Sequence, residues 1–285
     1  MSPGAFAAPG TPPACRSRSQ VLANVFYEPS TRTSCSFHAA MLRMGGGVVP
    51  VSGSTSSVTK GESLSDTIKT MACYCDAIVI RHPAKGSALE AALASPVPVL
   101  NAGDGAGEHP TQALLDLFTM CRERGVASPD GLTVTMLGDL KHGRTVHSLS
   151  RLLALYDVRL RLVSPAALAM PEDIVADLAA SGADVEQHEA LGEALLASTD
   201  VLYVTRVQKE RFDTPEAYQA ARGTYTVDKA VMASLPAAAV VMHPLPRVDE
   251  IHPEVDDDPR AAYFRQMRYG LFMRMALLRL LLLGA

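Results

Sequence analysis

Hydroxyl side chains and one arginine follow an apolar run near the start of this sequence. The segment FYEPSTRTSCSF overlaps the end of that run and contains four adjacent polar residues, Ser30, Thr31, Arg32 and Thr33. A helix that begins here presents unpaired backbone N–H groups and a partial positive charge, so these side chains would complete a phosphate-binding cradle. The alternative is an ordinary serine or threonine helix cap beside a solvated arginine.

Similar polar segments follow other apolar runs in both halves of the chain: RHP, NAGDGAGEHPTQ, GDLKHGR, TRVQ and HPLPR. Ligands of parallel sheets bind beyond the carboxyl ends of the strands. The repetition of arginine at such positions favours an anion site over chance clustering. The sequence has no GxxxxGKS or GxxxxGKT motif and no GxGxxG after a strand, which argues against P-loop and dinucleotide sites.

The elements that must position these segments alternate between strands and helices. Helices are predicted over Glu62–Ala72, from Pro110 to a stop at Gly125, and over Arg144–Tyr156. Strands are predicted at Val21–Phe26, Val48–Val51, Ala77–Ile80, Val97–Leu100, Leu132–Leu137, Val158–Val163, Asp184–Glu186, Val201–Val204 and Ala238–Met242. This alternation predicts an α/β protein of two domains, each with a parallel sheet flanked by helices.

Composition argues against nucleic-acid and membrane partners. The formal net charge is −4, tryptophan is absent and aromatic residues make up 5%, so neither a basic surface nor a base-stacking platform is expected. The most apolar segment, RYGLFMRMALLRLLLLGA, contains three arginines. No uncharged run therefore approaches the roughly 18 residues of a membrane span. We expect a core helix there, apolar around most of its circumference.

Cysteine usage indicates a reducing compartment. Five cysteines, an odd number, without a recognisable secretory segment predict reduced thiols and a cytoplasmic protein. Cys73 and Cys75 have no second ligand pair nearby, which disfavours a zinc site. We expect neither a metal nor a cofactor. Arg16 and Arg18 among serines leave a plastid transit peptide as the alternative localisation.

Seven segments resemble, in order, the successive motifs of the aspartate carbamoyltransferase family: FYEPSTRTSCSF, SSVTKGESLSDTI, RHP, NAGDGAGEHPTQALLD, GDLKHGRTVHSL, TRVQKERF and HPLPRVDEI. The resemblance runs from about residue 20 to the C-terminus. The related ornithine carbamoyltransferases share some of these segments. They would have an HCLP-type segment in place of HPLP, and an SMG-type loop that is absent here.

The resemblance implies transfer of the carbamoyl group of carbamoyl phosphate to L-aspartate. The products would be N-carbamoyl-L-aspartate and phosphate, in an early step of pyrimidine biosynthesis. The resemblance also implies a homotrimer whose active sites are shared between subunits. It leaves open whether the chain is part of a larger pyrimidine-synthesis polypeptide.

The resemblance assigns the carbamoyl phosphate ligands residue by residue. Ser30, Thr31, Arg32 and Thr33 form the phosphate cradle, and Arg81 is a second phosphate ligand. His109 and Gln112 bind the carbamoyl end, where His109 donates to the carbonyl oxygen as it becomes an oxyanion; the alternative for His109 is a helix cap only. The backbone carbonyls of Leu245 and Pro246 contact the carbamoyl amide and orient the attacking amine.

The resemblance assigns the aspartate ligands in the same way. Arg144 and Arg206 bind the carboxylates, for which bidentate arginine is suited, and Gln208 supports their pocket. Ser56 and Lys60 lie on a loop that reaches the neighbouring subunit's site; taken alone, Lys60 would be a solvated loop lysine. Asp139 is expected to orient neighbouring cations. The residues expected to be catalytic are Arg32, Thr33, Lys60, Arg81, His109 and Gln112.

The expected domains are an atypical or disordered N-terminus (1–19), a carbamoyl-phosphate domain (20–127), an aspartate domain (128–262) and a C-terminal helix (263–285) packing back on the first domain. The resemblance implies one or two helices ahead of Val21, whereas residues 1–19 contain four prolines and cannot form such a helix. We therefore expect an incomplete sequence of an active enzyme. The alternative is a catalytically impaired, truncated relative that binds carbamoyl phosphate or assembles with a full-length enzyme.

Overall fold

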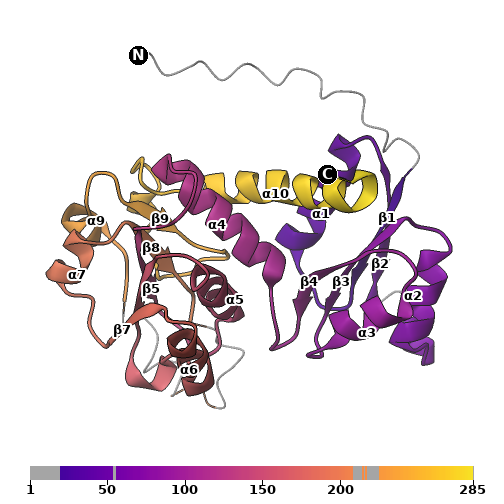
Figure 1. Cartoon of the computed structure of the whole chain (residues 1–285), viewed down its shortest axis with the longest axis horizontal. Coiled ribbons are helices and arrows are strands. Elements are labelled where there is room, and N and C mark those ends of the chain that lie inside the picture. The colour runs from indigo at the N-terminus through magenta and orange to yellow at the C-terminus, as the bar shows by residue number, and fades with distance from the viewer. Residues whose placement is uncertain (1–19, 54–55, 208–213, 215, 217–224, 285) are drawn as a thin grey trace. The chain divides into compact units, whose positions relative to one another are not determined.

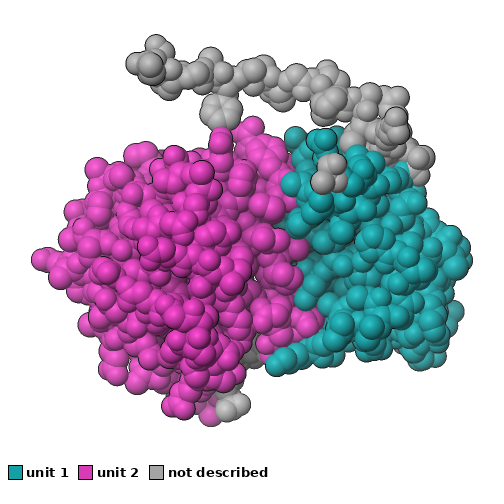
Figure 2. Space-filling view, viewed as in Figure 1, with its two compact units in different colours: residues 1–102, 274–285 teal, residues 103–273 magenta. Residues whose placement is uncertain are grey.

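The computed structural model describes residues 20–53, 56–207, 214, 216 and 225–284. The chain divides into two compact units, Met1–Ala102 with Arg274–Ala285 and Gly103–Met273 (Figure 2). Each unit contains one sheet of parallel strand pairs flanked by helices (Figure 1). The predicted α/β fold with two parallel sheets is therefore confirmed.

The sheet of the first unit has the strand order β2-β1-β3-β4. Its central strand β1 pairs in parallel with β2 and with β3. The buried faces of β1 and β3 pack with α2 and α3, which also contact each other. The strands are β1 (Val21–Phe26), β2 (Gly47–Ser52), β3 (Ala77–His82) and β4 (Val99–Asp104), and the helices are α1 (Thr31–Arg43), η3 (Ser57–Lys60), α2 (Leu64–Ala72) and α3 (Ser87–Ala94).

The sheet of the second unit has the order β7-β6-β5-β8-β9, and each neighbouring pair is parallel. One apolar core lies between this sheet and α4, α5 and α6, and another lies toward α7 and α9. The strands are β5 (Thr133–Leu137), β6 (Arg159–Val163), β7 (Asp184–His188), β8 (Val201–Val204) and β9 (Val240–Met242). The helices are α4 (Pro110–Arg124), α5 (Arg144–Leu153), η4 (Ala166–Leu168), α6 (Glu172–Ala180), α7 (Glu193–Ala197), α9 (Lys229–Ser234), η6 (Pro253–Val255) and α10 (Tyr263–Leu283).

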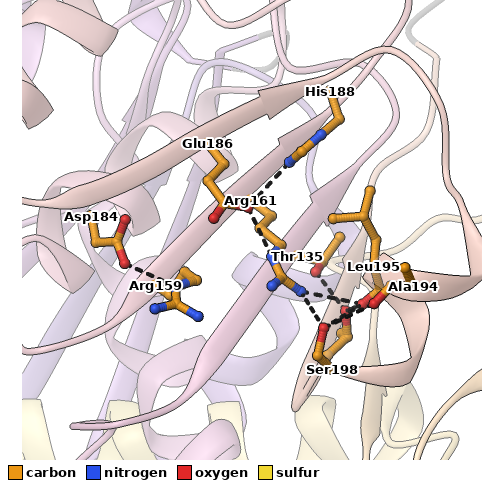
Figure 3. A network of polar contacts seen from close by, with 10 residues as sticks. Thr135, Arg159, Arg161, Asp184, Glu186, His188, Ala194, Leu195 and Ser198 are labelled. Atoms are coloured by element: carbon orange, nitrogen blue, oxygen red, sulfur yellow. Dashed lines mark hydrogen bonds and ion pairs between the residues drawn. The ribbon is translucent and has the colours of Figure 1, made fainter.

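Cross-strand ion pairs fix the edge strand β7 onto β6 (Figure 3). Arg159 lies opposite Asp184 and bonds to it at 2.8 Å, and Arg161 lies opposite Glu186 and bonds to it at 3.1 Å. Arg161 also donates to the hydroxyl of Ser198 at 2.9 Å, beyond the end of α7. Opposite charges in register stabilise a strand pair. We therefore interpret these arginines as structural.

The unit boundary falls inside β4, because α4 belongs with the second unit rather than with the strands that precede it. Helix α4 packs against α5, and Asp116 of α4 accepts a hydrogen bond from Tyr203 of β8. The end of α10 belongs with the first unit. There Gln20 donates to the carbonyl of Leu282 at 2.9 Å, and the Arg274 guanidinium lies 5.1 Å from the centroid of the Phe37 ring.

Two details of the predicted elements were wrong, the bounds of β4 and the burial of α10. Strand β4 includes Asn101–Asp104, which were expected in a loop, and starts only after Pro98, which has no N–H for a strand ladder. On α4, the fully or nearly buried residues include the polar side chains of Gln112, Asp116 and Thr119. Finally, α10 is not buried around its circumference. Leu278 is buried, whereas Phe272, Leu280, Leu281 and Leu283 are exposed.

The N-terminal expectations fall on residues 1–19, which lie outside the described residues. In the part of the chain that the structure describes, no helix combines the length and apolar character needed to cross a membrane. The cysteines of this part form no disulfide; they are Cys35, Cys73, Cys75 and Cys121.

Candidate functional site

The first polar segment forms the N-terminus of α1, as predicted. Ser30 is the N-cap residue, and its side chain makes no capping hydrogen bond. At the start of α2, by contrast, Ser63 does cap, and its hydroxyl accepts from the backbone N–H of Asp66 at 3.1 Å. The plain-cap alternative for Ser30 is therefore disfavoured, and its hydroxyl can serve a ligand. Arg32 is exposed and Thr33 is buried.

Parallel pairing places Arg81 beside this helix start. Arg81 lies opposite Phe26, the last residue of β1, and its carbonyl accepts from the N–H of Tyr27 at 2.8 Å. The Arg81 side chain is largely buried and donates to the carbonyl of Ala102 in β4 at 3.4 Å. It also forms an ion pair with Glu28 at 3.2 Å. The carboxyl ends of β1, β3 and β4 thus surround one oriented guanidinium.

The loop expected to serve a neighbouring subunit leads into η3. Ser56 donates through Oγ to the carbonyl of Gly53 at 3.3 Å. Lys60 is the last residue of η3 and is exposed. The structure therefore leaves the Lys60 ammonium accessible, which fits both the functional interpretation and the solvated-lysine alternative.

His109 and Gln112 lie at the start of α4. Pro110 occupies the first turn and Gly125 ends the helix with a φ of 68°, both as predicted. His109 is buried and makes no side-chain capping hydrogen bond. Its backbone N–H donates to the hydroxyl of Ser148 in α5 at 2.8 Å. The cap-only alternative for the His109 ring is therefore disfavoured.

Arg144 is the first residue of α5 and its guanidinium donates to the carbonyl of Gly105. The preceding loop leaves β5 at Gly138, where φ is 116° and an added Cβ would collide with the backbone oxygen of Thr205. Glycine is therefore required where the ends of β5 and β8 approach each other. Asp139 is fully buried and accepts from the N–H of His142 at 2.9 Å. It thereby holds the loop that leads to Arg144.

The remaining predicted ligands follow β8 and β9. Arg206 lies two residues after the end of β8 and is half-buried, whereas Gln208 falls outside the described residues. Leu245 has a φ of 56°, a conformation that costs an L-residue about 1–2 kcal/mol. Its N–H donates to Nδ1 of His243 at 2.8 Å, which helps to hold the Leu245-Pro246 turn. Strands β5, β8 and β9 are neighbours in one parallel sheet, so their carboxyl ends lie at the same edge of that sheet. Arg144, Arg206 and Leu245 follow these three ends.

Sequence reasoning missed several residues that support these ligands. Glu28 lies inside the first motif yet received no role, although it pairs with Arg81. Asp116, Tyr203 and Gln266 form a buried polar cluster that touches Gln112. The available signal was an acid, Asp116, between two leucines of a predicted helix. Among the described residues no group of three or more His, Cys, Asp or Glu could hold a metal ion.

Comparison with known proteins identifies the family of both units. Residues 10–122 match the model of the aspartate/ornithine carbamoyltransferase carbamoyl-P binding domain, and residues 130–281 match that of the Asp/Orn binding domain. The chain is 52% identical over 260 residues to the aspartate carbamoyltransferase catalytic subunit of Archaeoglobus fulgidus, covering 91% of this chain and 85% of that protein. It is 56% identical over 261 residues to multifunctional protein CAD of Squalus acanthias, but spans only 12% of that protein's length.

Comparison with solved structures identifies the same family. Aspartate transcarbamoylase from Trypanosoma cruzi in complex with N-(phosphonacetyl)-L-aspartic acid is 48% identical, with a TM-score of 0.86, covering 93% of this chain and 84% of that one. The matches extend over both units. The chain therefore belongs to the aspartate/ornithine carbamoyltransferase family and, within it, groups with the aspartate carbamoyltransferases.

Proposed function

We propose that this chain transfers the carbamoyl group of carbamoyl phosphate to L-aspartate in pyrimidine biosynthesis. The proposal rests on one observation: in each of the two sheets, arginines lie at or after the carboxyl ends of the strands. An uncapped helix start beside Arg81 suits a phosphate, and Arg144 and Arg206 follow strands that share one edge and supply two cations for a dicarboxylate. The relatives that support it include T. cruzi aspartate transcarbamoylase, solved with carbamoyl phosphate and aspartate.

The roles follow from charge and chemistry. Ser30, Thr31, Arg32 and Thr33 of residues 20–127 bind the phosphate together with Arg81. His109 and Gln112 bind the carbamoyl group, with the turn at Leu245 and Pro246. Arg144 and Arg206 of residues 128–262, together with Gln208, bind the aspartate carboxylates.

The reaction needs positioning and electrostatic stabilisation more than covalent catalysis. The amine nitrogen of aspartate attacks the carbonyl carbon, and the carbonyl electron pair moves onto oxygen. His109 donates a hydrogen bond to that oxyanion. Collapse of the tetrahedral intermediate breaks the bond between carbon and the phosphate oxygen, and the departing phosphate takes the proton from the amine.

We also propose that the active form is a homotrimer with shared sites. Ser56 and Lys60 would act in a neighbouring copy, which would give the exposed Lys60 a function. The multifunctional relatives, of whose length the chain spans about 12%, support attachment to a larger pyrimidine-synthesis polypeptide. Because the cysteine content predicts reduced thiols, we also propose a cytoplasmic location.

Replacing Arg32 with alanine is expected to weaken carbamoyl phosphate binding by about 1.5–3 kcal/mol, because a charge-assisted contact to the phosphate is lost. This corresponds to about 10- to 150-fold in Kd. Calorimetric titration of the variant measures the change. Arg43→Ala is the matched control, since it removes an exposed arginine from the other end of the same helix. Unchanged affinity in Arg32→Ala would remove Arg32 from the site.

A bisubstrate ligand tests whether one site takes both substrates. N-(phosphonacetyl)-L-aspartate should bind far more tightly than carbamoyl phosphate or aspartate alone, because linking two ligands removes the entropic cost of the second association. The matched control is the ornithine analogue of this ligand, whose cationic side chain would face Arg144 and Arg206. Equal affinity for the two mimics in calorimetry would overturn aspartate as the acceptor.

A further inference from the structure

The acid Asp116 lies fully buried at the centre of a polar network in the second unit. Its Oδ1 accepts from Nε2 of Gln112 at 2.9 Å and from Nε2 of Gln266 at 2.6 Å, and its Oδ2 accepts from the hydroxyl of Tyr203 at 2.7 Å. Burial, and then the nearby carboxylate, raise the pKa of Tyr203 well above its ordinary value, so this hydroxyl remains a donor. A buried carboxylate is costly without such donors.

This network fixes which way the side chain of Gln112 faces. Both carboxyl oxygens of Asp116 accept hydrogen bonds in this network, so Gln112 turns its NH2 group, and not its oxygen, toward Asp116. Its Oε1 is consequently directed away from Asp116 and is presented as an acceptor. A carbamoyl group carries an NH2 that needs acceptors. The orientation imposed on Gln112 therefore matches the group that it is proposed to bind.

A second arm of the network reaches the turn at Leu245. Because Gln266 commits its Nε2 to Asp116, its Oε1 accepts from the backbone N–H of His243 at 3.0 Å. Nδ1 of His243 accepts from the N–H of Leu245 at 2.8 Å, so the ring carries its proton on Nε2 and donates it to Oε1 of Glu250 at 2.7 Å. Burial acts to raise the pKa of Glu250, but hydrogen bonds from His243 and the backbone outweigh burial and lower it. Glu250 is therefore an ionised acceptor for the ring.

We propose that Asp116 is a positioning residue that fixes two acceptors for the substrate's carbamoyl NH2 group, the side-chain oxygen of Gln112 and the backbone carbonyl of Leu245. The inference rests on the proposed function, in which these groups bind the carbamoyl end. The two acceptors come from segments far apart in the chain, and one carboxylate holds both. Asp116 does not touch the substrate; it acts through Gln112 and Gln266.

A ligand that lacks the NH2 group separates positioning from general structural support. Acetyl phosphate has a methyl group in place of the carbamoyl NH2 and keeps the carbonyl and the phosphate. Loss of the oriented acceptors should therefore weaken carbamoyl phosphate binding and leave acetyl phosphate binding nearly unchanged. A merely structural role would weaken both ligands together.

The experiment compares Asp116→Asn with the unsubstituted chain and with Glu123→Gln. Glu123→Gln neutralises an acid on the same helix that bonds to Arg265 rather than to this network. Kd values for both ligands come from calorimetry or from competition, and melting temperatures verify that each variant is folded. We expect Asp116→Asn to weaken carbamoyl phosphate by about tenfold, with acetyl phosphate and the Glu123→Gln control unaffected.

A second variant, Gln266→Leu, keeps the Asp116–Gln112 hydrogen bond and removes the arm that runs from Asp116 through Gln266 to His243. It carries the same expectation if Asp116→Asn does not fold. Equal losses for the two ligands, or unchanged carbamoyl phosphate affinity, would overturn the inference while the proposed function stands. An unsubstituted chain that binds no carbamoyl phosphate would overturn both.

Discussion

Replacing His109 with alanine is expected to lower kcat by about 10²- to 10³-fold, the loss typical of one oxyanion-stabilising donor, which corresponds to about 3–4 kcal/mol. His109 is buried at the start of α4, and its backbone is held by Ser148 of α5. The backbone that carries the ring is therefore held in place before substrate arrives. The substrate KM values should change much less, because the oxyanion exists only in the transition state. Steady-state kinetics with both substrates varied measures the effect.

The matched control for this substitution is His252→Ala. The side chain of His252 is 56% exposed, and no role in the site is proposed for it. Its replacement should leave kcat and KM unchanged. A kcat for His109→Ala within a few-fold of the unsubstituted value would contradict the assigned role, since no other described residue is proposed to donate to the carbonyl oxygen.

Mixing the inactive variants Lys60→Ala and Arg144→Ala is expected to restore activity. If each site takes Lys60 from one subunit and Arg144 from the next, some sites of a hybrid trimer contain both residues. Random exchange of equal amounts gives about a quarter of all sites intact, as follows from the cyclic arrangement of three copies. The measurement is turnover after subunit exchange, with exchange itself followed by native mass spectrometry.

A second mixture supplies the control for shared sites. Ser56→Ala and Lys60→Ala alter the same contributed segment, so every site in their hybrids lacks one of the two residues. Mixing these two variants should give no more activity than the average of the separate proteins. Absence of recovery in the Lys60 and Arg144 mixture, with exchange demonstrated, would show that each chain completes its own site.

Local sequence signals predicted the elements that hold the ligands. Strands β1 and β8 have the bounds expected from their apolar runs, and Pro110 and Gly125 mark the ends of α4 as expected. These features depend on neighbours within a few residues. The parallel order of the strands then accounts for the placement of Arg81 within the carboxyl end of β3, and of Arg144 and Arg206 after the carboxyl ends of β5 and β8.

The support behind the ligands could not be predicted in the same way. In the sequence, Asp116 is a charged residue between two leucines. No pattern in the neighbouring residues indicates that its hydrogen-bond donors, Tyr203 and Gln266, lie 87 and 150 residues away. Burial of α10 was overestimated for a related reason. An apolar composition indicates which residues can be buried, whereas the packing of other elements decides which of them are buried, as Leu278 and Leu280 illustrate.

The most direct test of the central claim is product formation by the purified chain in the presence of carbamoyl phosphate, L-aspartate and L-ornithine at equal concentrations. Mass spectrometry identifies the carbamoylated product, and a phosphate assay measures the leaving group. N-carbamoyl-L-aspartate and phosphate should appear in equal amounts, and the His109→Ala variant should lose both signals together. Carbamoylation of ornithine to a comparable extent, or phosphate release without carbamoyl aspartate, would contradict the account.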